Sequence, residues 1–351
     1  MQEPFAALQQ KVVTDPLLPV FHSELFQVAL PVGHRFPSAK YGKLRQRIQA
    51  ELASIEIREA PEATRGELAL VHEPAYVEAV MAGTLDSRAL RDIGFPWSEA
   101  LAQRSCRSTG ATVAAMREVL GLAPATGRAE PAGTERELGR GRVPIAGNLG
   151  GGTHHARADG GSGYCVFNDV AVAARVAQME HARRLRRTGG RPLPVAVIDL
   201  DVHQGNGTAQ IFHGDDSVFT LSIHGEKNFP FRKHAGDLDV DLPDGCGDDA
   251  YLHALDFALA ELAQRFTPEL VFFIAGADVH ERDRLGRLKL SRSGVQARDR
   301  RVFDWAIERA LPMVVVMGGG YGADIDETVD IQMGTWRTVL EAARRWQNRR
   351  T

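Results

Sequence analysis

The sequence alternates short apolar runs with stretches of helical period, and this alternation restricts the fold more than any other feature. Runs rich in β-branched and other apolar residues stand at 143–147, 194–200, 217–223, 269–276 and 311–319. Stretches with apolar residues at helical spacing precede or separate several of them, at 98–119, 168–185, 248–266 and 293–310. Strands that alternate with helices form parallel sheets covered by helices. The sequence therefore predicts an α/β fold with a mostly parallel open sheet and helices on both faces.

Polar segments follow each of these predicted strands. In chain order they read GGGTHH, DVHQGNG, HGEKNF, ADVHERD and GGGY. The carboxyl ends of parallel strands meet at one edge of a sheet, and open α/β sheets bind their ligands outside that edge. We therefore expect one active site there, to which all five segments contribute.

The segment DLDVH at 199–203 is the sharpest of these motifs. In an extended chain Asp199, Asp201 and His203 point to one side, so a carboxylate and an imidazole can bind one cation. Asp278 ends another apolar strand, where an unpaired charge is costly. A DxH pair also occurs by chance, and a lone aspartate at a strand end can be a helix N-cap. Together, one histidine and two aspartates favour a catalytic zinc site, because they leave a position open for water and substrate.

Two adjacent histidines, His154 and His155, stand in a glycine-rich segment. Neighbouring side chains of a strand point to opposite faces, so the pair suits a single metal ion poorly, and a flexible surface loop is the simplest alternative. Hydrolysis at a metal site, however, needs a base for the water and an acid for the leaving group, and two imidazoles can supply both. Tyr321 follows the last glycine run, and its hydroxyl can donate to the oxygen that becomes negative.

Composition excludes several other classes of protein. A net charge of −3 gives no general basic surface for nucleic acid, and no apolar run approaches the ~20 residues of a membrane span. Three cysteines without CxxC spacing and an N-terminus unlike a signal peptide indicate a reducing compartment, so we expect a cytoplasmic protein. We interpret residues 1–351 as one catalytic domain with a flexible insertion at 121–142, which is rich in Gly, Pro, Ala and charge. The oligomeric state is not indicated.

Five ordered motifs resemble a known family. They read GGTHHARADGGSGYCVFND, VAVIDLDVHQGNG, TLSIH, AGADVHERDRLG and MGGGYG, and the likeness extends from about residue 22 to about residue 340. In this they resemble the zinc-dependent histone deacetylases, which have the arginase–deacetylase fold. HQGNG and RDRLGRL are most similar to class IV members and their bacterial relatives.

The resemblance implies a role for each of several residues. The implied zinc ligands are Asp201, His203 and Asp278, and the implied catalytic residues are His154, His155, Tyr321, Asp199 and Asn206. Within that group, Asp199 would orient the first histidine. Asn206, where most members have Asp, would orient the second.

Further roles follow from the same resemblance. A structural potassium ion would be bound by Asp199, Ser222 and the carbonyl of Ile223. The substrate would be contacted by Gly163, Tyr164, Phe229 and Gly319. Lys40 would be a basic residue near an internal cavity, and the small residues at 150–153 would leave space for an acyl chain longer than acetyl.

These expectations lead to two candidate functions, and two further classes of protein were considered. The first is zinc-dependent hydrolysis of the amide of an acylated lysine side chain in a protein or peptide, in which a zinc-bound water attacks the acyl carbonyl. The second uses the same groups on a small acylated amine such as an acetylpolyamine. A dimanganese ureohydrolase would need further carboxylates, but Gln204, Gly205 and Val279 stand next to the candidate ligands. A binding module that had lost catalysis would lack one of the histidines or the tyrosine.

Overall fold

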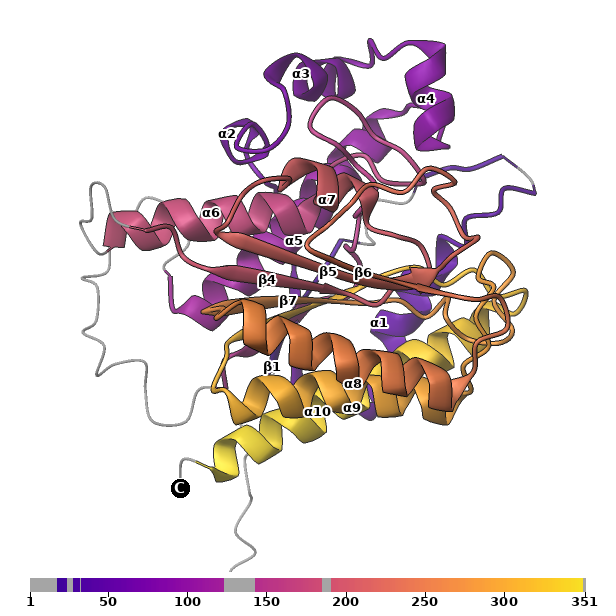
Figure 1. Ribbon diagram of the computed structural model, residues 1–351. Helices are drawn as coiled ribbons and strands as arrows, with labels where there is room; N and C mark the ends of the chain where they lie inside the picture. The colour runs from indigo at the N-terminus through magenta and orange to yellow at the C-terminus, as the bar shows by residue number, and fades with distance from the viewer. Residues whose placement is uncertain (1–17, 24–27, 32, 123–142, 185–190, 350–351) are drawn as a thin grey trace, which may run out of the picture.

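One sheet of eight strands organises the molecule (Figure 1). The computed structural model describes residues 18–23, 28–31, 33–122, 143–184 and 191–349. The strand order is β2-β1-β3-β8-β7-β4-β5-β6, and every neighbouring pair is parallel. The strands are β1 (Leu18–His22), β2 (Ile55–Glu59), β3 (Ile145–Asn148), β4 (Val195–Asp199), β5 (Val218–Gly225), β6 (Leu238–Leu242), β7 (Leu270–Ala275) and β8 (Met313–Met317).

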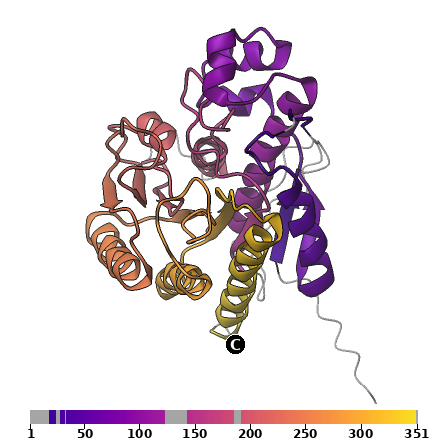
Figure 2. The same ribbon diagram turned by 90° about the vertical axis from the view of Figure 1, so that its right-hand side faces the viewer.

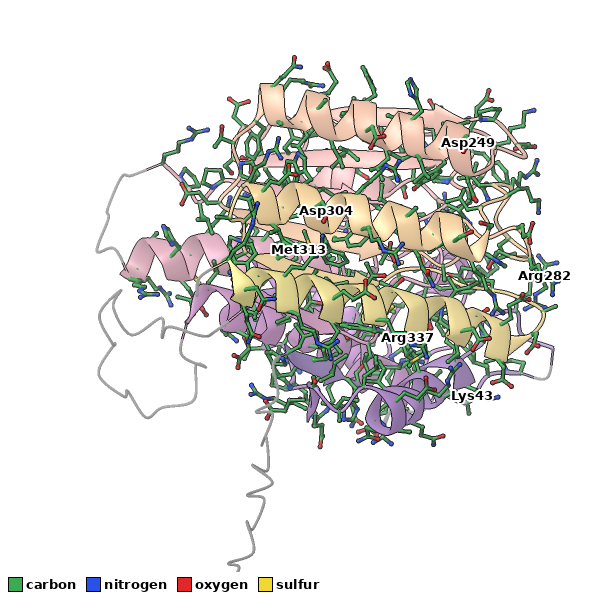
Figure 3. The ribbon with its side chains drawn as sticks, turned by 90° about the horizontal axis from the view of Figure 1, so that it is seen from below. Lys43, Asp249, Arg282, Asp304, Met313 and Arg337 are labelled. Carbon is green, nitrogen blue, oxygen red and sulfur yellow. The ribbon has the colours of Figure 1, made fainter. Side chains whose placement is uncertain are left out.

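Helices cover both faces of this sheet. They are α1 (Ala39–Glu51), α2 (Arg65–Leu68), α3 (Pro74–Ala82), α4 (Ser87–Ile93), α5 (Glu99–Leu120), α6 (Asp169–Arg184), α7 (Asn206–Ile211), α8 (Asp248–Arg265), α9 (Arg292–Glu308) and α10 (Ile325–Asn348). Figure 3 shows α8, α9 and α10 side by side under one face, with α1 next to α10. Helices α5 and α6 pack together on the other face, beside α2 and α3.

The central strands are apolar because helices cover them on both sides. Every residue of β4, β5, β7 and β8 is buried. Phe272 and Phe273 of β7 are both fully buried, but they belong to two different apolar clusters, one on each face. Alternate side chains of a strand point to opposite faces, so both faces must be apolar here and the strand appears as a continuous apolar run.

The predicted α/β class with a parallel sheet is confirmed, and the five predicted strands and four predicted helices are present with shifted ends. The strand expected at 311–319 ends at Met317, where Gly318 begins the loop toward the site. Three strands were not predicted: β1, β2 and β6. Strands β2 and β6 lie at the two edges of the sheet, and their sequences IEIRE and LDVDL carry charged residues that remain partly exposed.

The predicted insertion at 121–142 begins where α5 ends. Gly121 follows that helix in the left-handed conformation, with a φ of 61°, which is a common helix terminator. Residues 123–142 lie outside the described part of the chain, and the predicted flexibility of the insertion stays a prediction. The same is true of the assignment of residues 1–351 to one domain. Among the described helices, none combines the length and apolar character needed to cross a bilayer.

The parallel arrangement brings the loops that follow the strands to one edge. Figure 3 shows Arg282, in the loop after β7, at the right-hand edge of the molecule, well apart from Met313, the first residue of β8. Figure 2 views this edge, and the connections from the strand ends to the following helices lie toward the viewer. The residues singled out in the sequence lie in these loops.

Candidate active site

A buried group of two carboxylates and one imidazole lies at the ends of β4 and β7. One ligand atom from each of Asp201, His203 and Asp278 can be chosen so that all lie within 4.8 Å of one another. Strands β4 and β7 are adjacent, with Asp199 beside Ile274, so the residues that follow them leave the sheet side by side. The Nδ1 atom of His203 lies 2.9 Å from Asp201 Oδ1 and 3.3 Å from Asp278 Oδ2. The structure therefore brings together the three residues that the sequence singled out as metal ligands.

Glycine backbone encloses this group. A Cβ atom on Gly319 would lie 1.8 Å from Asp278 Oδ2, and one on Gly276 would lie 2.5 Å from the Cα of Asp201. The amide of Gly319 donates to Asp201 Oδ2 at 2.5 Å. Gly319 was expected to contact the substrate. It does line the cavity of the site, and it also holds one of the candidate metal ligands.

The charges of this group fit a divalent cation. Asp278 is fully buried, and its Oδ2 atom has no hydrogen-bond partner among the described residues. Burial and the nearby charge of Asp201 raise the pKa of Asp278 to about 7. Two carboxylates buried together need a counter-charge, because neither can be fully ionised alone at low cost. One cation with two carboxylate ligands and one imidazole ligand would supply it, and this donor set suits zinc.

The two adjacent histidines lie beside this group with different partners. His154 donates from Nδ1 to Asp199 Oδ2 at 2.6 Å, and His155 donates from Nδ1 to Asn206 Oδ1 at 2.7 Å. Their ring centroids are 4.2 Å apart, and both rings are buried. Each Nδ1 atom is therefore engaged, which leaves each Nε2 atom for proton transfer. The predicted contact between Asn206 and His155 is present.

The two partners give the imidazoles different acidities. Burial lowers the pKa of His154, but the charges of Asp199 and Asp201 outweigh this and raise it to about 9. Burial and the neighbouring charges of His154 and His203 lower the pKa of His155 well below its usual value, and the amide of Asn206 compensates only in part. The pKa values of the two adjacent imidazoles are therefore shifted in opposite directions.

Asp169 holds the glycine-rich segment that carries the histidines, although the sequence analysis did not single it out. This carboxylate is fully buried at the start of α6. It accepts hydrogen bonds from the amides of Gly152 and Thr153 at 3.2 and 2.8 Å, and from the Thr112 hydroxyl at 2.6 Å. The two adjacent histidines can thus point to one site because Asp169, at the start of α6, fixes the loop that carries them. The FND motif was its only signal in the sequence.

Tyr321 lies on the other side of the metal-ligand group. Its ring centroid is 6.2 Å from that of His203. The Tyr321 amide donates to Asp283 Oδ2 at 2.6 Å, and Arg284 Nε donates to the Tyr321 carbonyl at 2.8 Å. Burial and the charge of Asp201 raise the pKa of the Tyr321 hydroxyl well above its usual value, so it remains a proton donor. Asp283 and Arg284, which fix this loop, were missed because they lie in a different segment of the sequence.

Two of the residues predicted to contact the substrate, Gly163 and Phe229, lie against the second histidine. Gly163 has a φ of 52°, and a Cβ atom there would lie 2.6 Å from His155 Cδ2 and 3.0 Å from Phe229 Cε1. The rings of Phe229 and His155 have centroids 4.8 Å apart. Tyr164 continues the wall, and two aromatic residues that were not predicted join it: Phe36 and Phe95, at ring-centroid distances of 5.3 and 5.2 Å.

A cavity of about 80 Å³ connects these walls with the metal-ligand group. It extends past the glycines at 150–152 to Lys40 and Arg104, so the space expected behind the histidines exists. Its far end carries cationic side chains, whereas an aliphatic acyl chain would need an apolar surface. Gly152 has a φ of 64°, and a Cβ there would lie 3.0 Å from the Cα of Gly318, so a bulkier residue would strain the backbone.

The residues expected to bind potassium lie next to one another on the sheet. Asp199 of β4 is paired with Ser222 of β5. The hydroxyl of Ser222 lies 2.9 Å from His224 Nδ1, and the Ile223 side chain is buried in the apolar core. These contacts do not indicate a cation, and the potassium site stays a prediction.

Comparisons with known proteins give a consistent result. Residues 34–332 match the histone deacetylase domain. An uncharacterized protein of Picosynechococcus sp. is 37% identical over 89% of this chain and 94% of its own length. The histone deacetylase-like amidohydrolase of Pseudomonas aeruginosa is 32% identical over 77% of this chain and 67% of its own. Histone deacetylase 2 of Arabidopsis thaliana is 38% identical, but over 50% of this chain and 43% of its own length.

Solved structures share the fold. The crystal structure of an acetylpolyamine aminohydrolase from Burkholderia pseudomallei aligns with a TM-score of 0.66 over 92% of this chain and 98% of that one, at 21% identity. The HDA15 HD domain aligns with a TM-score of 0.68 over 93% of each chain, at 22% identity. The predicted arginase–deacetylase architecture is confirmed by these alignments.

Proposed function

This chain belongs to the histone deacetylase family, and we propose that it is a zinc-dependent amidohydrolase that removes an acyl group from a lysine side chain. One observation carries the proposal. A metal-ligand group, two histidines with unlike partners and a buried tyrosine converge on one cavity.

The histidines would divide the proton transfers between them. A divalent cation bound by Asp201, His203 and Asp278 would polarise the substrate carbonyl and acidify a water molecule. The neutral His155 would accept the proton of the attacking water at Nε2 and deliver it to the departing lysine nitrogen. The cationic His154, held by Asp199, would stabilise the negative charge that develops on oxygen in the tetrahedral intermediate.

Tyr321 would stabilise the oxygen of the tetrahedral intermediate. Its hydroxyl keeps its proton because of burial and the nearby carboxylates, so it can donate a hydrogen bond to an oxyanion. Asp283 and Arg284 fix its backbone from either side. The donor is therefore oriented before the substrate binds.

The substrate of the proposal is an acyl-lysine in a protein or peptide. The loop that carries Phe229 also carries Lys227 and Arg232, which are exposed. Positive charges on the loop that carries Phe229 disfavour a polyamine, which is itself a polycation. An acylated lysine in a peptide has no such charge at the reacting end, and the aromatic walls suit its aliphatic stem. The small acylated amine remains the second candidate.

Activity on matched substrates tests both candidates. The purified protein should hydrolyse an acetyl-lysine peptide faster than acetylspermidine or acetylputrescine, as measured by kcat/KM. A chelator should abolish the activity, and Zn²⁺ should restore it. Elemental analysis should give one catalytic divalent ion per chain. Two tightly bound metal ions would instead indicate ureohydrolase chemistry, and faster turnover of the acetylpolyamines would favour the second candidate.

The variant Asp278→Asn provides the control for the metal. It removes one ligand charge, so metal content and activity should fall together. Asp256→Asn, at an exposed aspartate of α8 far from the cavity, is the matched change. It should leave both unchanged.

A further inference from the structure

Two cationic side chains line the far end of the cavity, and no carboxylate among the described residues forms an ion pair with either of them. The side chain of Lys40 is buried, with only 1% of its surface exposed, and its Nζ atom donates to the Gly320 carbonyl at 3.1 Å. The guanidinium of Arg104, on α5, forms neither a hydrogen bond nor an ion pair within the described part of the chain. A buried ammonium needs a partner, because burial removes its water.

The two cations lie over the same two aromatic rings, Tyr41 and Phe36. Lys40 Nζ is 5.1 Å from the centroid of the Tyr41 ring, and Arg104 Cζ is 4.7 Å from the same centroid. Both also lie over Phe36, at 5.8 and 5.6 Å. Aromatic faces stabilise a cation in part, but they do not cancel its charge. A single small anion between these rings could interact with both cations.

This end of the cavity is next to the reacting groups. Lys40 Nζ lies 5.2 Å from the centroid of the Tyr321 ring, and Lys40, Arg104, Asp201 and His203 line the same cavity. Tyr41 closes the space behind the histidine loop, since a Cβ on Gly150 would lie 3.5 Å from its Cε1 atom. An acyl chain whose carbonyl is held at Tyr321 and the metal-ligand group would therefore extend toward these two cations.

We propose that this cavity accepts acyl groups that end in a carboxylate, such as malonyl or succinyl, and that Lys40 and Arg104 bind that carboxylate. The inference rests on the proposed function. In the reaction, water adds its oxygen to the acyl carbon and the carbon–nitrogen bond breaks. The lysine nitrogen leaves with a proton, so that a succinyl-lysine yields succinate and a lysine amine.

The size of the cavity agrees with a short acyl group. At about 30 Å³ per water molecule, its volume of about 80 Å³ corresponds to room for two to three water molecules. This is enough for the few atoms beyond the carbonyl of a succinyl group, whereas a long aliphatic chain would have to place methylene groups against two cations. The charge of a carboxylate would be matched there by charge-assisted hydrogen bonds.

One peptide with three different acyl-lysines tests the proposal. The acyl groups are acetyl, succinyl and succinamoyl, the last being a neutral amide of nearly the same shape as succinyl. The holoenzyme should hydrolyse the succinyl peptide with a kcat/KM roughly tenfold or more above that of the succinamoyl peptide, because only the former carries an anion. An equal or higher kcat/KM for succinamoyl would overturn the proposal.

Variants of Arg104 connect the preference to this site. In Arg104→Gln the ratio of the succinyl to the succinamoyl kcat/KM should fall to near one, and in Arg104→Lys, which keeps the charge, much of it should remain. Arg300→Gln is the matched control, because Arg300 is exposed on α9 and pairs only loosely with Glu341. A ratio that is the same in Arg104→Gln as in the unmodified enzyme would overturn the assignment.

Two further measurements separate the explanations that compete with this one. If the cavity only receives the free carboxylate product, acetate and succinate will inhibit acetyl-lysine hydrolysis in an Arg104-dependent way while the succinyl peptide is not hydrolysed, which overturns the proposal. If no peptide is hydrolysed, the proposed function fails. In that case, isothermal titration calorimetry of the metal-free full chain with each peptide tests the carboxylate site separately. Tighter binding of the succinyl peptide than of the succinamoyl peptide supports the site, and equal binding overturns it.

Discussion

At the scale of single residues, the partner of each histidine sets its charge. His154 faces a carboxylate and His155 faces an amide, at nearly equal distances of 2.6 and 2.7 Å. An aspartate stabilises imidazolium, whereas the oxygen of an amide does so much less. Asp199 and Asn206 differ only in having a carboxylate or an amide at the end of the side chain. This difference helps to shift the pKa values of two adjacent buried imidazoles in opposite directions.

Replacement of Asn206 by aspartate should change the pH dependence of the reaction. A carboxylate beside His155 would raise the pKa of this imidazole, which burial and two cationic neighbours now hold well below its usual value. The proposed base must be neutral, so the acid limb of the kcat/KM profile should move to higher pH in Asn206→Asp. The pH–rate profiles of both proteins, compared at saturating Zn²⁺, provide the measurement. An acid limb at the same pH would show that His155 is not the base.

Removal of the tyrosine hydroxyl should affect turnover more than binding. In Tyr321→Phe the ring remains to pack against Tyr164 and Lys40, but the donor to the oxyanion is lost. We expect kcat to fall roughly 100-fold or more, with little change in metal content. Single-substrate kinetics and elemental analysis test this. Turnover close to that of the unmodified enzyme would exclude the role of the hydroxyl.

At the scale of secondary-structure elements, α9 ties together the two strand ends that carry the metal ligands. Arg298 is fully buried on α9, and its Nη1 atom donates to the carbonyls of Leu200 and Gly276 at 3.1 and 2.6 Å. Leu200 directly precedes Asp201, and Gly276 lies two residues before Asp278. Asp299 neutralises the guanidinium at 2.7 Å. One side chain thus fixes the spacing of β4 and β7 at the point where their ligands emerge.

Substitution of Arg298 should therefore weaken metal binding. Arg298→Lys keeps the charge next to Asp299, but one ammonium cannot reproduce the planar group of donors that spans both carbonyls. We expect a folded protein with a lower affinity for Zn²⁺, measured by competition with a chromophoric chelator. Arg298→Met leaves the buried carboxylate of Asp299 unpaired and should lower the free energy of unfolding by roughly 3–5 kcal/mol. An unchanged Zn²⁺ affinity in Arg298→Lys would show that the strand ends keep their spacing without it.

At the scale of the whole molecule, the metal-ligand group links metal binding to global stability. Asp201, His203 and Asp278 are buried at the ends of the adjacent strands β4 and β7, in the middle of the sheet. A cation that binds the folded state and not the unfolded state stabilises the fold by mass action, by about 2.7 kcal/mol at a concentration 100 times Kd. Removal of the metal should therefore lower the melting temperature of the entire protein.

The stabilisation by zinc should grow as the pH rises. In the metal-free protein, burial and the charge of Asp201 raise the pKa of Asp278 to about 7. Burial lowers the pKa of His203, but the carboxylates of Asp201 and Asp278 outweigh this and raise it to about 10. Raised pKa values mean that the folded metal-free protein keeps protons that the unfolded chain releases, so its stability falls as the pH rises toward and through these values. Zinc displaces those protons.

Thermal unfolding with and without Zn²⁺ at pH 6 and pH 8 tests this expectation. The increase in melting temperature caused by Zn²⁺ should be larger at pH 8, because fewer protons compete for the ligands. In Asp278→Asn both the increase and its pH dependence should be reduced. A larger increase at pH 6 than at pH 8 would contradict the assignment of these groups as the metal ligands.

The sequence by itself determined the buried strands, which appear as continuous apolar runs, and those site residues that form short local motifs. Buried parallel strands must be apolar on both faces, so β4, β5, β7 and β8 were predicted from their composition. The edge strands β2 and β6 were not, because exposure permits charged residues there. The DLDVH motif, the histidine pair and the tyrosine were recognisable because each is a local arrangement of chemically specific side chains.

Only the tertiary structure decided which distant residues support that site. Asp169, Arg298 and Arg104 lie on three different helices, and no spacing in the sequence connects them with the histidines or the metal ligands. Lys40 was expected near an internal cavity from the family resemblance alone. Isolated acids and bases on helices are usually solvent-exposed, so their type alone predicts a surface position. The fold buries Lys40, Asp169 and Arg298 and half-buries Arg104, and there the loss of water makes each charge interact strongly with the few groups around it. Their effect on the site is therefore a property of burial, which the order of residues along the chain does not express.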